Sequence, residues 1–162
     1  MRYVLIFFIM LVGCSTADNK KDDRIETVLS LANTGDREAI HAACYRFLYG
    51  EGTKQDYVNA AFWCKRSAEA NLSSGQTLYA EILYNGLGVQ KDVKKAIYWY
   101  TEAANNNHPH AMLMLFFIYV DGNGVTANPE LAYFYLKKAA ELGYDKAIEI
   151  LNEINKKAII KV

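Results

Sequence analysis

The sequence predicts an all-α protein, an α/α solenoid of stacked helix-turn-helix repeats. Glycines recur in pairs 36 residues apart, at Gly50 and Gly52, Gly86 and Gly88, and Gly122 and Gly124. Small and aromatic residues follow at the same interval, without any gap, at Ala60, Ala96 and Ala132 and at Trp63, Trp99 and Tyr135. A fixed period of this length is typical of solenoid proteins.

The first residues are not predicted to belong to the solenoid. Residues 1–13 combine Arg2 with an apolar run, which is typical of a secretory signal and too short for an anchored membrane-spanning helix. The stretch LVGC resembles the lipobox of bacterial lipoproteins, in which the cysteine, here Cys14, becomes the lipidated first residue of the mature chain. The alternative is an ordinary cleaved signal with a chance cysteine. Residues 14–23 are polar and charged, and we expect a flexible tether there.

The remaining residues divide into three full repeats and two caps. Stepping back one period from Ala68 and Asn71 gives Ala32 and Gly35, so residues 24–35 are predicted to form an N-terminal capping helix. The full repeats are residues 36–71, 72–107 and 108–143, and residues 144–162 form a C-terminal capping helix and tail. Half-units at both ends would cover core faces that an uncapped solenoid exposes.

Each repeat is predicted to hold two helices, one on either side of the glycine turn. Small or apolar residues before the turn are spaced four apart, which is a helical period. In the first repeat they are Ala39, Ala43 and Phe47. Just before each second helix stands a short acceptor side chain that can cap exposed amides. These capping residues are Asp56, Asp92 and Asn128. The Gly-Leu-Gly of residues 86–88 is therefore interpreted as an interhelical turn, because a phosphate loop would need a preceding strand and a Lys-Ser/Thr ending.

The motif G-x-G-V-x-x-D-x-x-x-A-x-x-W-Y-x-x-A-A, seen in residues 86–104, resembles the repeat of the Sel1-like family, a relative of the tetratricopeptide repeat. The resemblance covers roughly residues 24–155. It implies a right-handed superhelix with half-repeat caps. The first copy departs from the pattern at Thr53, where the other copies have Val89 and Val125, and at Cys64.

Neither motifs nor composition indicate an enzyme, a metal site or a cofactor. The common hydrolase signatures S-x-x-K, G-x-S-x-G and H-E-x-x-H do not occur in the sequence. His41, His108 and His110 have no nearby cluster of cysteines or carboxylates, so we expect surface histidines without a ligand role. Removal of residues 1–13 leaves 17 Lys and Arg against 18 Asp and Glu, a net charge of −1. Such a balance gives no reason to expect nucleic acid binding.

The cysteines Cys44 and Cys64 form either a disulfide or two buried free thiols. Antiparallel pairing about the turn would place Cys44 nearest Ala60, one helical turn from Cys64, and this offset disfavours the bond. Some secreted, cysteine-rich Sel1-like proteins have been described as binding or slowly cleaving β-lactams. Their cysteines form closely spaced pairs that join adjacent copies, whereas Cys44 and Cys64 lie within one copy, so the resemblance to that subgroup is poor.

A partner-binding groove is predicted on the first helices, because in tetratricopeptide-like stacks these helices line the concave face. The predicted groove residues are Glu38, His41, Tyr45, Tyr49, Glu81, Tyr84, Asn85, Phe117 and Asp121. Aromatic rings with polar neighbours are typical of protein-binding surfaces. The alternative is that some of these rings are tucked into neighbouring copies.

These features together predict a non-enzymatic, membrane-tethered module that binds a protein or peptide. Ser15 follows Cys14, and in enteric-type bacteria a residue other than Asp there implies the outer membrane, facing the periplasm. Resemblance to some small Sel1-like lipoproteins implies a more specific role, that of an immunity protein that neutralises a periplasm-delivered toxic effector such as a phospholipase. The sequence also leaves open a β-lactam-binding or β-lactamase-like protein, and a scaffold without a strong partner.

Overall fold

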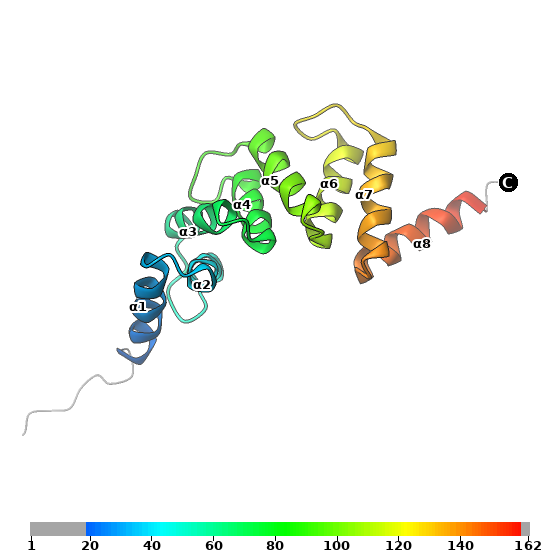
Figure 1. Ribbon diagram of the computed structural model, residues 1–162. Helices are drawn as coiled ribbons and strands as arrows, with labels where there is room; N and C mark the ends of the chain where they lie inside the picture. The colour runs from blue at the N-terminus through cyan, green and yellow to red at the C-terminus, as the bar shows by residue number, and fades with distance from the viewer. Residues whose placement is uncertain (1–18, 160–162) are drawn as a thin grey trace, which may run out of the picture.

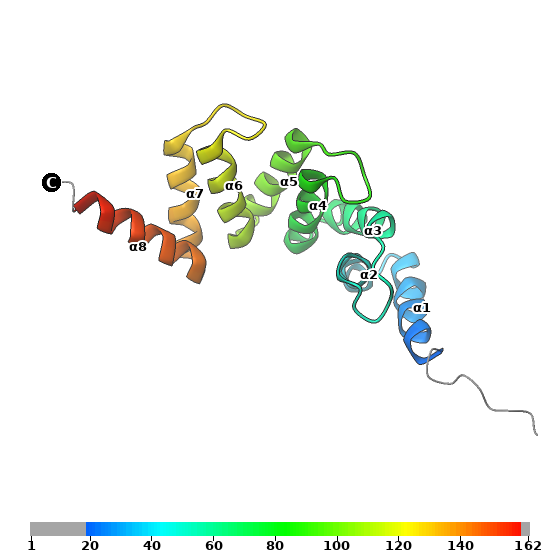
Figure 2. The same ribbon diagram turned by 180° about the vertical axis from the view of Figure 1, so that it is seen from behind.

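A computed structural model of the protein describes residues 19–159, which form eight α-helices in a row (Figures 1 and 2). The helices are α1 (Asn19–Asn33), α2 (Arg37–Tyr49), α3 (Tyr57–Glu69), α4 (Ser73–Asn85), α5 (Val93–Asn105), α6 (Pro109–Asp121), α7 (Pro129–Glu141) and α8 (Asp145–Ile159). Each helix packs on the next one along the chain, and the array bends into an arc with α1 and α8 at opposite ends (Figure 1). The predicted all-α solenoid is confirmed for this part of the chain.

The first helix begins earlier than the sequence suggests. α1 starts at Asn19, so residues 19–23, predicted as part of a flexible tether, are helical. The reason is that lysine favours helix, and a polar composition alone does not prevent a helix. The predicted signal peptide of residues 1–13 and the lipidation site Cys14 lie outside the described residues. None of the helices in residues 19–159 is long and apolar enough to cross a membrane.

The ends of the helices follow local sequence signals. Asp56 Oδ1 accepts hydrogen bonds of 3.0 Å from the amides of Val58 and Asn59, and caps α3. Asp92 and Asn128 cap α5 and α7 in the same way. A short acceptor side chain at this position satisfies amides that have no partner within the helix. The capping predicted from the sequence is therefore present in all three repeats.

The second glycine of the second and third pairs packs against the preceding repeat. Gly88 has a left-handed φ of +66°, and a Cβ built on it would overlap the backbone of Tyr57 at the start of α3. A Cβ on Gly124 would overlap the side chain of Val93 at the start of α5. Gly52, which no full repeat precedes, has no atom within 4 Å of the equivalent position. The turn of one repeat thus packs against the second helix of the repeat before it.

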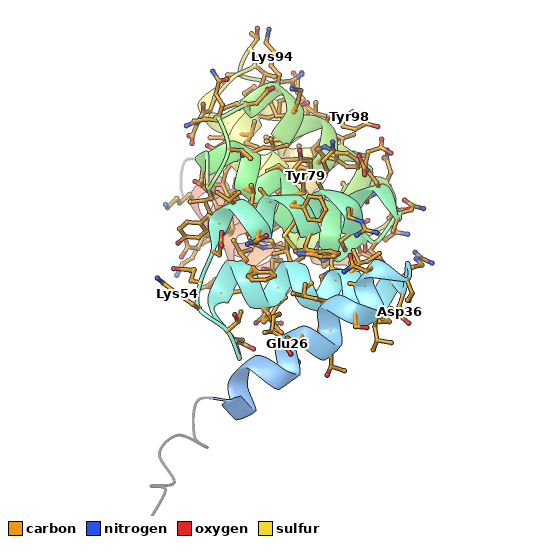
Figure 3. All side chains as sticks on the ribbon, turned by 90° about the vertical axis from the view of Figure 1, so that its left-hand side faces the viewer. Glu26, Asp36, Lys54, Tyr79, Lys94 and Tyr98 are labelled. Atoms are coloured by element: carbon orange, nitrogen blue, oxygen red, sulfur yellow. A yellow bond between two sulfur atoms is a disulfide. The ribbon has the colours of Figure 1, made fainter. Side chains whose placement is uncertain are left out.

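The core runs along the stack, with small residues where helices approach closely. Trp63 is 5% exposed, whereas Trp99, which stands at the equivalent position one period later, is only half-buried. The ring of Tyr79 packs edge-on against Trp99, with centroids 5.7 Å apart, and the residue equivalent to Tyr79 in the first repeat is Ala43. The smaller side chain lets Trp63 sink further into the core. Figure 3, viewed from the α1 end, shows Tyr79 inside the outline of the molecule and Lys94 at its edge.

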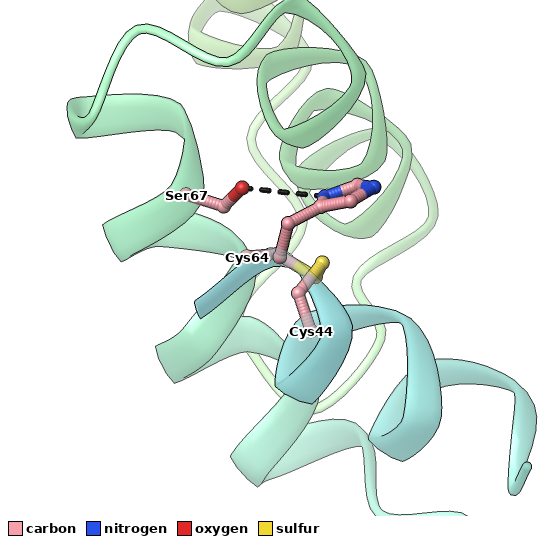
Figure 4. The surroundings of a disulfide bond; sticks show 4 residues. Cys44, Cys64 and Ser67 are labelled. Carbon is pink, nitrogen blue, oxygen red and sulfur yellow. Dashed lines mark hydrogen bonds between the residues drawn. A yellow bond between two sulfur atoms is a disulfide. The ribbon is translucent and has the colours of Figure 1, made fainter. Parts of the chain in front are cut away.

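A disulfide joins Cys44 of α2 to Cys64 of α3, with the two Cα atoms 4.6 Å apart (Figure 4). The sequence leaves the disulfide as one of two alternatives and disfavours it, because Cys44 is expected to lie opposite Ala60; that expected offset is wrong. The connection between α2 and α3 ends only at Asp56, so the midpoint of this connection lies further along the chain than the two glycines suggest. The position on α3 that faces Cys44 is therefore shifted from Ala60 toward Cys64. The equivalent pairs in the other repeats are Ala80 with Tyr100 and Phe116 with Leu136. All six side chains are buried, so the disulfide occupies a position that apolar packing fills elsewhere.

Candidate functional site

A pocket of about 250 Å³ opens between the first helices of the three repeats. It is lined by His41, Tyr45 and Tyr49 of α2, by Ser74, Thr77, Leu78 and Glu81 of α4, and by His108 and His110 at the start of α6. We call this set of residues the first-helix pocket. α2 packs directly against α4, its counterpart in the next repeat. Contact between equivalent helices is expected on the inner side of a bent array, where successive repeats are closest.

Three imidazoles are held in this pocket by hydrogen bonds. His41 Nδ1 lies 3.3 Å from Ser67 Oγ, one helical turn beyond the disulfide, as the dashed line in Figure 4 shows. His108 Nδ1 lies 3.0 Å from Thr77 Oγ1. His110 bridges two elements, with Nε2 2.8 Å from Glu81 Oε1 of α4 and Nδ1 3.1 Å from the Tyr144 hydroxyl. The orientations of all three rings are therefore fixed by partners from other helices or turns.

Burial makes two of these histidines weak bases. Burial lowers the pKa of His41, against a smaller opposing effect of the Glu38 carboxylate. Burial also lowers the pKa of His108, and neighbouring His110 and His41 lower it further, while Glu81 opposes them. Because both pKa values lie below the ordinary 6.5, both rings are neutral at neutral pH.

Tyr45 and Tyr49 form the exposed wall of the pocket. Their ring centroids are 4.6 Å apart, and 40% and 49% of their surfaces are exposed. Partial burial raises the pKa of the Tyr49 hydroxyl, and the Glu81 carboxylate raises it further. The two tyrosine rings and the Glu81 carboxylate therefore line the same pocket, although they come from adjacent repeats.

The hydroxyl groups paired with two of the imidazoles are buried. Ser67 is fully buried and Thr77 is 2% exposed, so neither hydroxyl can reach a substrate as a nucleophile. Within residues 19–159, no group of three or more His, Cys, Asp or Glu side chains is arranged to hold a metal ion. What the pocket offers is one carboxylate, three imidazoles and two aromatic faces.

The structure brings together four of the nine predicted groove residues, namely His41, Tyr45, Tyr49 and Glu81. The other five lie outside the first-helix pocket and are Glu38, Tyr84, Asn85, Phe117 and Asp121. Tyr84 is half-buried, because its hydroxyl accepts a 2.6 Å hydrogen bond from Asn123 of the next glycine turn and Lys91 Nζ lies 5.3 Å from its ring centroid. Asn85 donates to the Glu81 carbonyl, and Phe117 stands exposed beside Phe116.

The sequence alone predicts surface histidines without a ligand role, and it places only His41 in the predicted groove. His108 is the clearest omission, since it stands at the N-cap position of α6 but makes no capping hydrogen bond. Its ring binds Thr77 of the preceding repeat instead. The sequence does contain a signal that groups the histidines, because every histidine of the chain lies on a first helix or directly before one.

Comparison with known proteins gives a consistent result. The Sel1 repeat model matches residues 37–72, 73–108 and 109–144. The structure is similar to a Sel1 repeat protein from Oxalobacter formigenes, with 27% identity, a TM-score of 0.66, and coverage of 76% of this chain and 57% of that chain. It is similar to c5321, a protective antigen present in uropathogenic Escherichia coli strains that displays an SLR fold, with 26% identity, a TM-score of 0.77, and coverage of 83% and 29%. A search of curated proteins finds no match.

A third similar structure is Helicobacter pylori cysteine rich protein B, with 22% identity, a TM-score of 0.67, and coverage of 85% of this chain and 99% of that chain. At this identity the likeness concerns the fold alone. The chain spans 57% and 29% of the first two relatives, and so less than two thirds of either. The three matched segments cover 108 of the 162 residues and coincide with three helix pairs, so the chain belongs to the Sel1 repeat family.

Proposed function

We propose that this protein is a binding module that captures a segment of a partner protein in the first-helix pocket. Sel1 repeats generally mediate protein–protein interaction, and their proteins are typically non-catalytic scaffolds. The observation that carries the proposal is the origin of the pocket: its walls come from α2, α4 and α6, one helix from each of three successive repeats. Tyr45 and Tyr49 stay exposed there, although the core beneath them is complete. Exposed aromatic side chains around a pocket favour a protein-binding role.

The protein is proposed to act without catalysis. This is supported by the burial of Ser67 and Thr77, the hydroxyls that accompany the pocket histidines, and by the absence of hydrolase signatures from the sequence. A β-lactam hydrolysis assay with the purified full chain checks this directly. We expect no turnover above the buffer rate, and hydrolysis that purifies with the chain would contradict the proposal.

The protein is also proposed to be a lipoprotein anchored through Cys14 in the outer membrane, facing the periplasm. The sequence supports this proposal through LVGC and through Ser15. Cys14→Ser should remove lipid labelling and shift the protein from the membrane fraction to a precursor or soluble form. One acyl chain anchors only marginally, so we expect the usual three-chain modification. Unchanged lipid labelling of the variant would refute this location.

Site-specific crosslinking in native membranes tests the binding face. A photo-crosslinking amino acid at position 49 should capture a partner, whereas the same group at position 94, on the exposed Lys94 of α5, should capture none. Tyr49→Ala should weaken capture by roughly 1–2 kcal/mol or more if it is a hot spot, and Phe117→Ala, outside the pocket, should not. Identification of a secreted toxic effector as the captured protein would specify an immunity role. Capture from position 94 alone would refute the proposal.

A further inference from the structure

The geometry of the first-helix pocket points to a specific occupant: we infer that it receives one cationic side chain, arginine or lysine, from an extended segment of the partner. This inference rests on the proposed binding function and specifies its chemistry. A volume of about 250 Å³ is below the range of pockets for drug-sized ligands, and it suits a single long side chain. Three features of the pocket select a positive charge.

The first feature is a carboxylate with no Lys or Arg side chain beside it in the pocket. Glu81 is the one acidic side chain among the lining residues, and no Lys or Arg lines the pocket. Its Oε1 accepts a hydrogen bond from His110 Nε2, and His110 Nδ1 lies 3.1 Å from the Tyr144 hydroxyl. The contact with His110 fixes the position of the carboxylate, and no Lys or Arg side chain of the pocket competes for it. The Glu81 side chain is 24% exposed, and a cation entering from solvent can reach it.

The second feature is a hydrogen-bond acceptor on His108, which lines the same pocket as Glu81. Thr77 Oγ1 donates its only proton to the Ser73 carbonyl at 2.9 Å. His108 Nδ1, 3.0 Å from the same oxygen, must therefore be the donor, which leaves the proton of the neutral ring on Nδ1. Within the described residues, no hydrogen bond engages His108 Nε2, so its lone pair is available to an N–H of a ligand. A guanidinium or ammonium group supplies several such donors.

The third feature is the pair of aromatic rings. Tyr45 and Tyr49 flank the opening with their centroids 4.6 Å apart, and both are substantially exposed. The faces of such rings attract cations, and they also cover the apolar stem of a long side chain. Aromatic faces beside a carboxylate favour a cation over a neutral or acidic group of the same size.

Acid should expel the cation. His41 faces Ser67 and Glu38, and His108 faces Thr77, Glu81 and His110. Both imidazoles are neutral at neutral pH because burial lowers their pKa. Protonation of either ring below pH 6.5 would add a positive charge to the space that the ligand cation occupies. By reciprocity, the bound cation should lower the pKa of both rings further.

The chain supplies its own reporter for this test, because its three histidines all line the pocket. The full chain in neutral detergent is titrated with acetyl-Gly-Gly-Arg-Gly-Gly-amide while the imidazole C–H resonances are followed by NMR. The matched probe replaces arginine with citrulline, which has nearly the same shape and no charge. At pH 7.5 we expect the arginine peptide to shift these resonances with an affinity about tenfold or more above that of the citrulline peptide. This difference should decrease as the pH is lowered through the pKa values of His41 and His108, which lie below 6.5.

Two variants locate the effect. Glu81→Gln keeps an acceptor for His110 but removes the charge, and it should reduce arginine-peptide affinity about tenfold or more. Glu69→Gln changes an exposed side chain of α3 outside the pocket, and this variant should bind the arginine peptide like the unmodified chain. Equal binding of the arginine and citrulline peptides in the pocket would overturn the cation inference and leave the proposed binding function intact. Absence of any imidazole shift at about 10 mM arginine peptide would also overturn it. Failure of the binding function is a separate result, namely crosslinking of a partner from position 94 and not from position 49.

Discussion

Reduction of the disulfide between Cys44 and Cys64 should destabilise the protein substantially. The bond links α2 and α3 across a sequence separation of 20. In the chain-entropy model, a loop of this length removes about 11 cal/mol/K from the unfolded chain, which corresponds to about 3 kcal/mol of stability at 25 °C. Reduction is the cleanest perturbation, because it leaves both side chains in place and creates no cavity.

The assay is urea denaturation of the full chain, followed by circular dichroism, with and without dithiothreitol. We expect reduction to lower the free energy of unfolding by about 3 kcal/mol. The variant with both Cys44→Ala and Cys64→Ala serves as the control, since dithiothreitol should leave it unchanged. This variant should be less stable than the reduced protein, because it also loses two fully buried sulfur atoms.

A local effect should accompany the loss of stability. His41 lies one turn before Cys44, and its partner Ser67 lies three residues after Cys64. Reduction should therefore loosen this hydrogen bond and shift the His41 imidazole resonance more than that of His110. A change in unfolding free energy below about 1 kcal/mol would refute the reasoning, because the helices would then be held in register without the crosslink.

Three further predictions concern the repeats and can be checked by urea denaturation. Gly88→Ala should cost well over the roughly 1–2 kcal/mol of a left-handed alanine, because the added Cβ meets the preceding repeat, whereas Gly52→Ala should cost only that amount. Tyr100→Phe should be neutral or stabilising, since the buried Tyr100 hydroxyl has no hydrogen-bond partner in residues 19–159; a loss above about 1 kcal/mol would reveal one. Trp63→Ala should cost about 3–5 kcal/mol and Trp99→Ala clearly less, because only Trp63 is fully packed; equal losses would contradict this distinction.

The sequence by itself determined the architecture, because the signals for a helical repeat are local and occur in every copy. Asp56, Asp92 and Asn128 cap second helices through contacts within three residues, and the left-handed glycines end first helices regardless of their neighbours. The family resemblance was likewise visible in the spacing of residues 86–104, and the match to three Sel1 repeats confirms it. A pattern that depends on nearby residues can be recognised without knowing how the copies are placed in space.

The tertiary structure decided which side chains meet. Tyr49 and Tyr84 hold nearly equivalent places at the ends of their helices, yet Tyr49 lines the pocket while Tyr84 binds Asn123 of the next glycine turn. The histidines converge only because α2, α4 and the start of α6 face the same space. The disulfide likewise depends on how α2 crosses α3 after a connection whose centre the period does not specify. A 36-residue period determines which residue types occur in each copy. The rotation between neighbouring copies depends instead on the volumes of the side chains packed between them. A small change in this rotation moves a side chain from the surface to an interface.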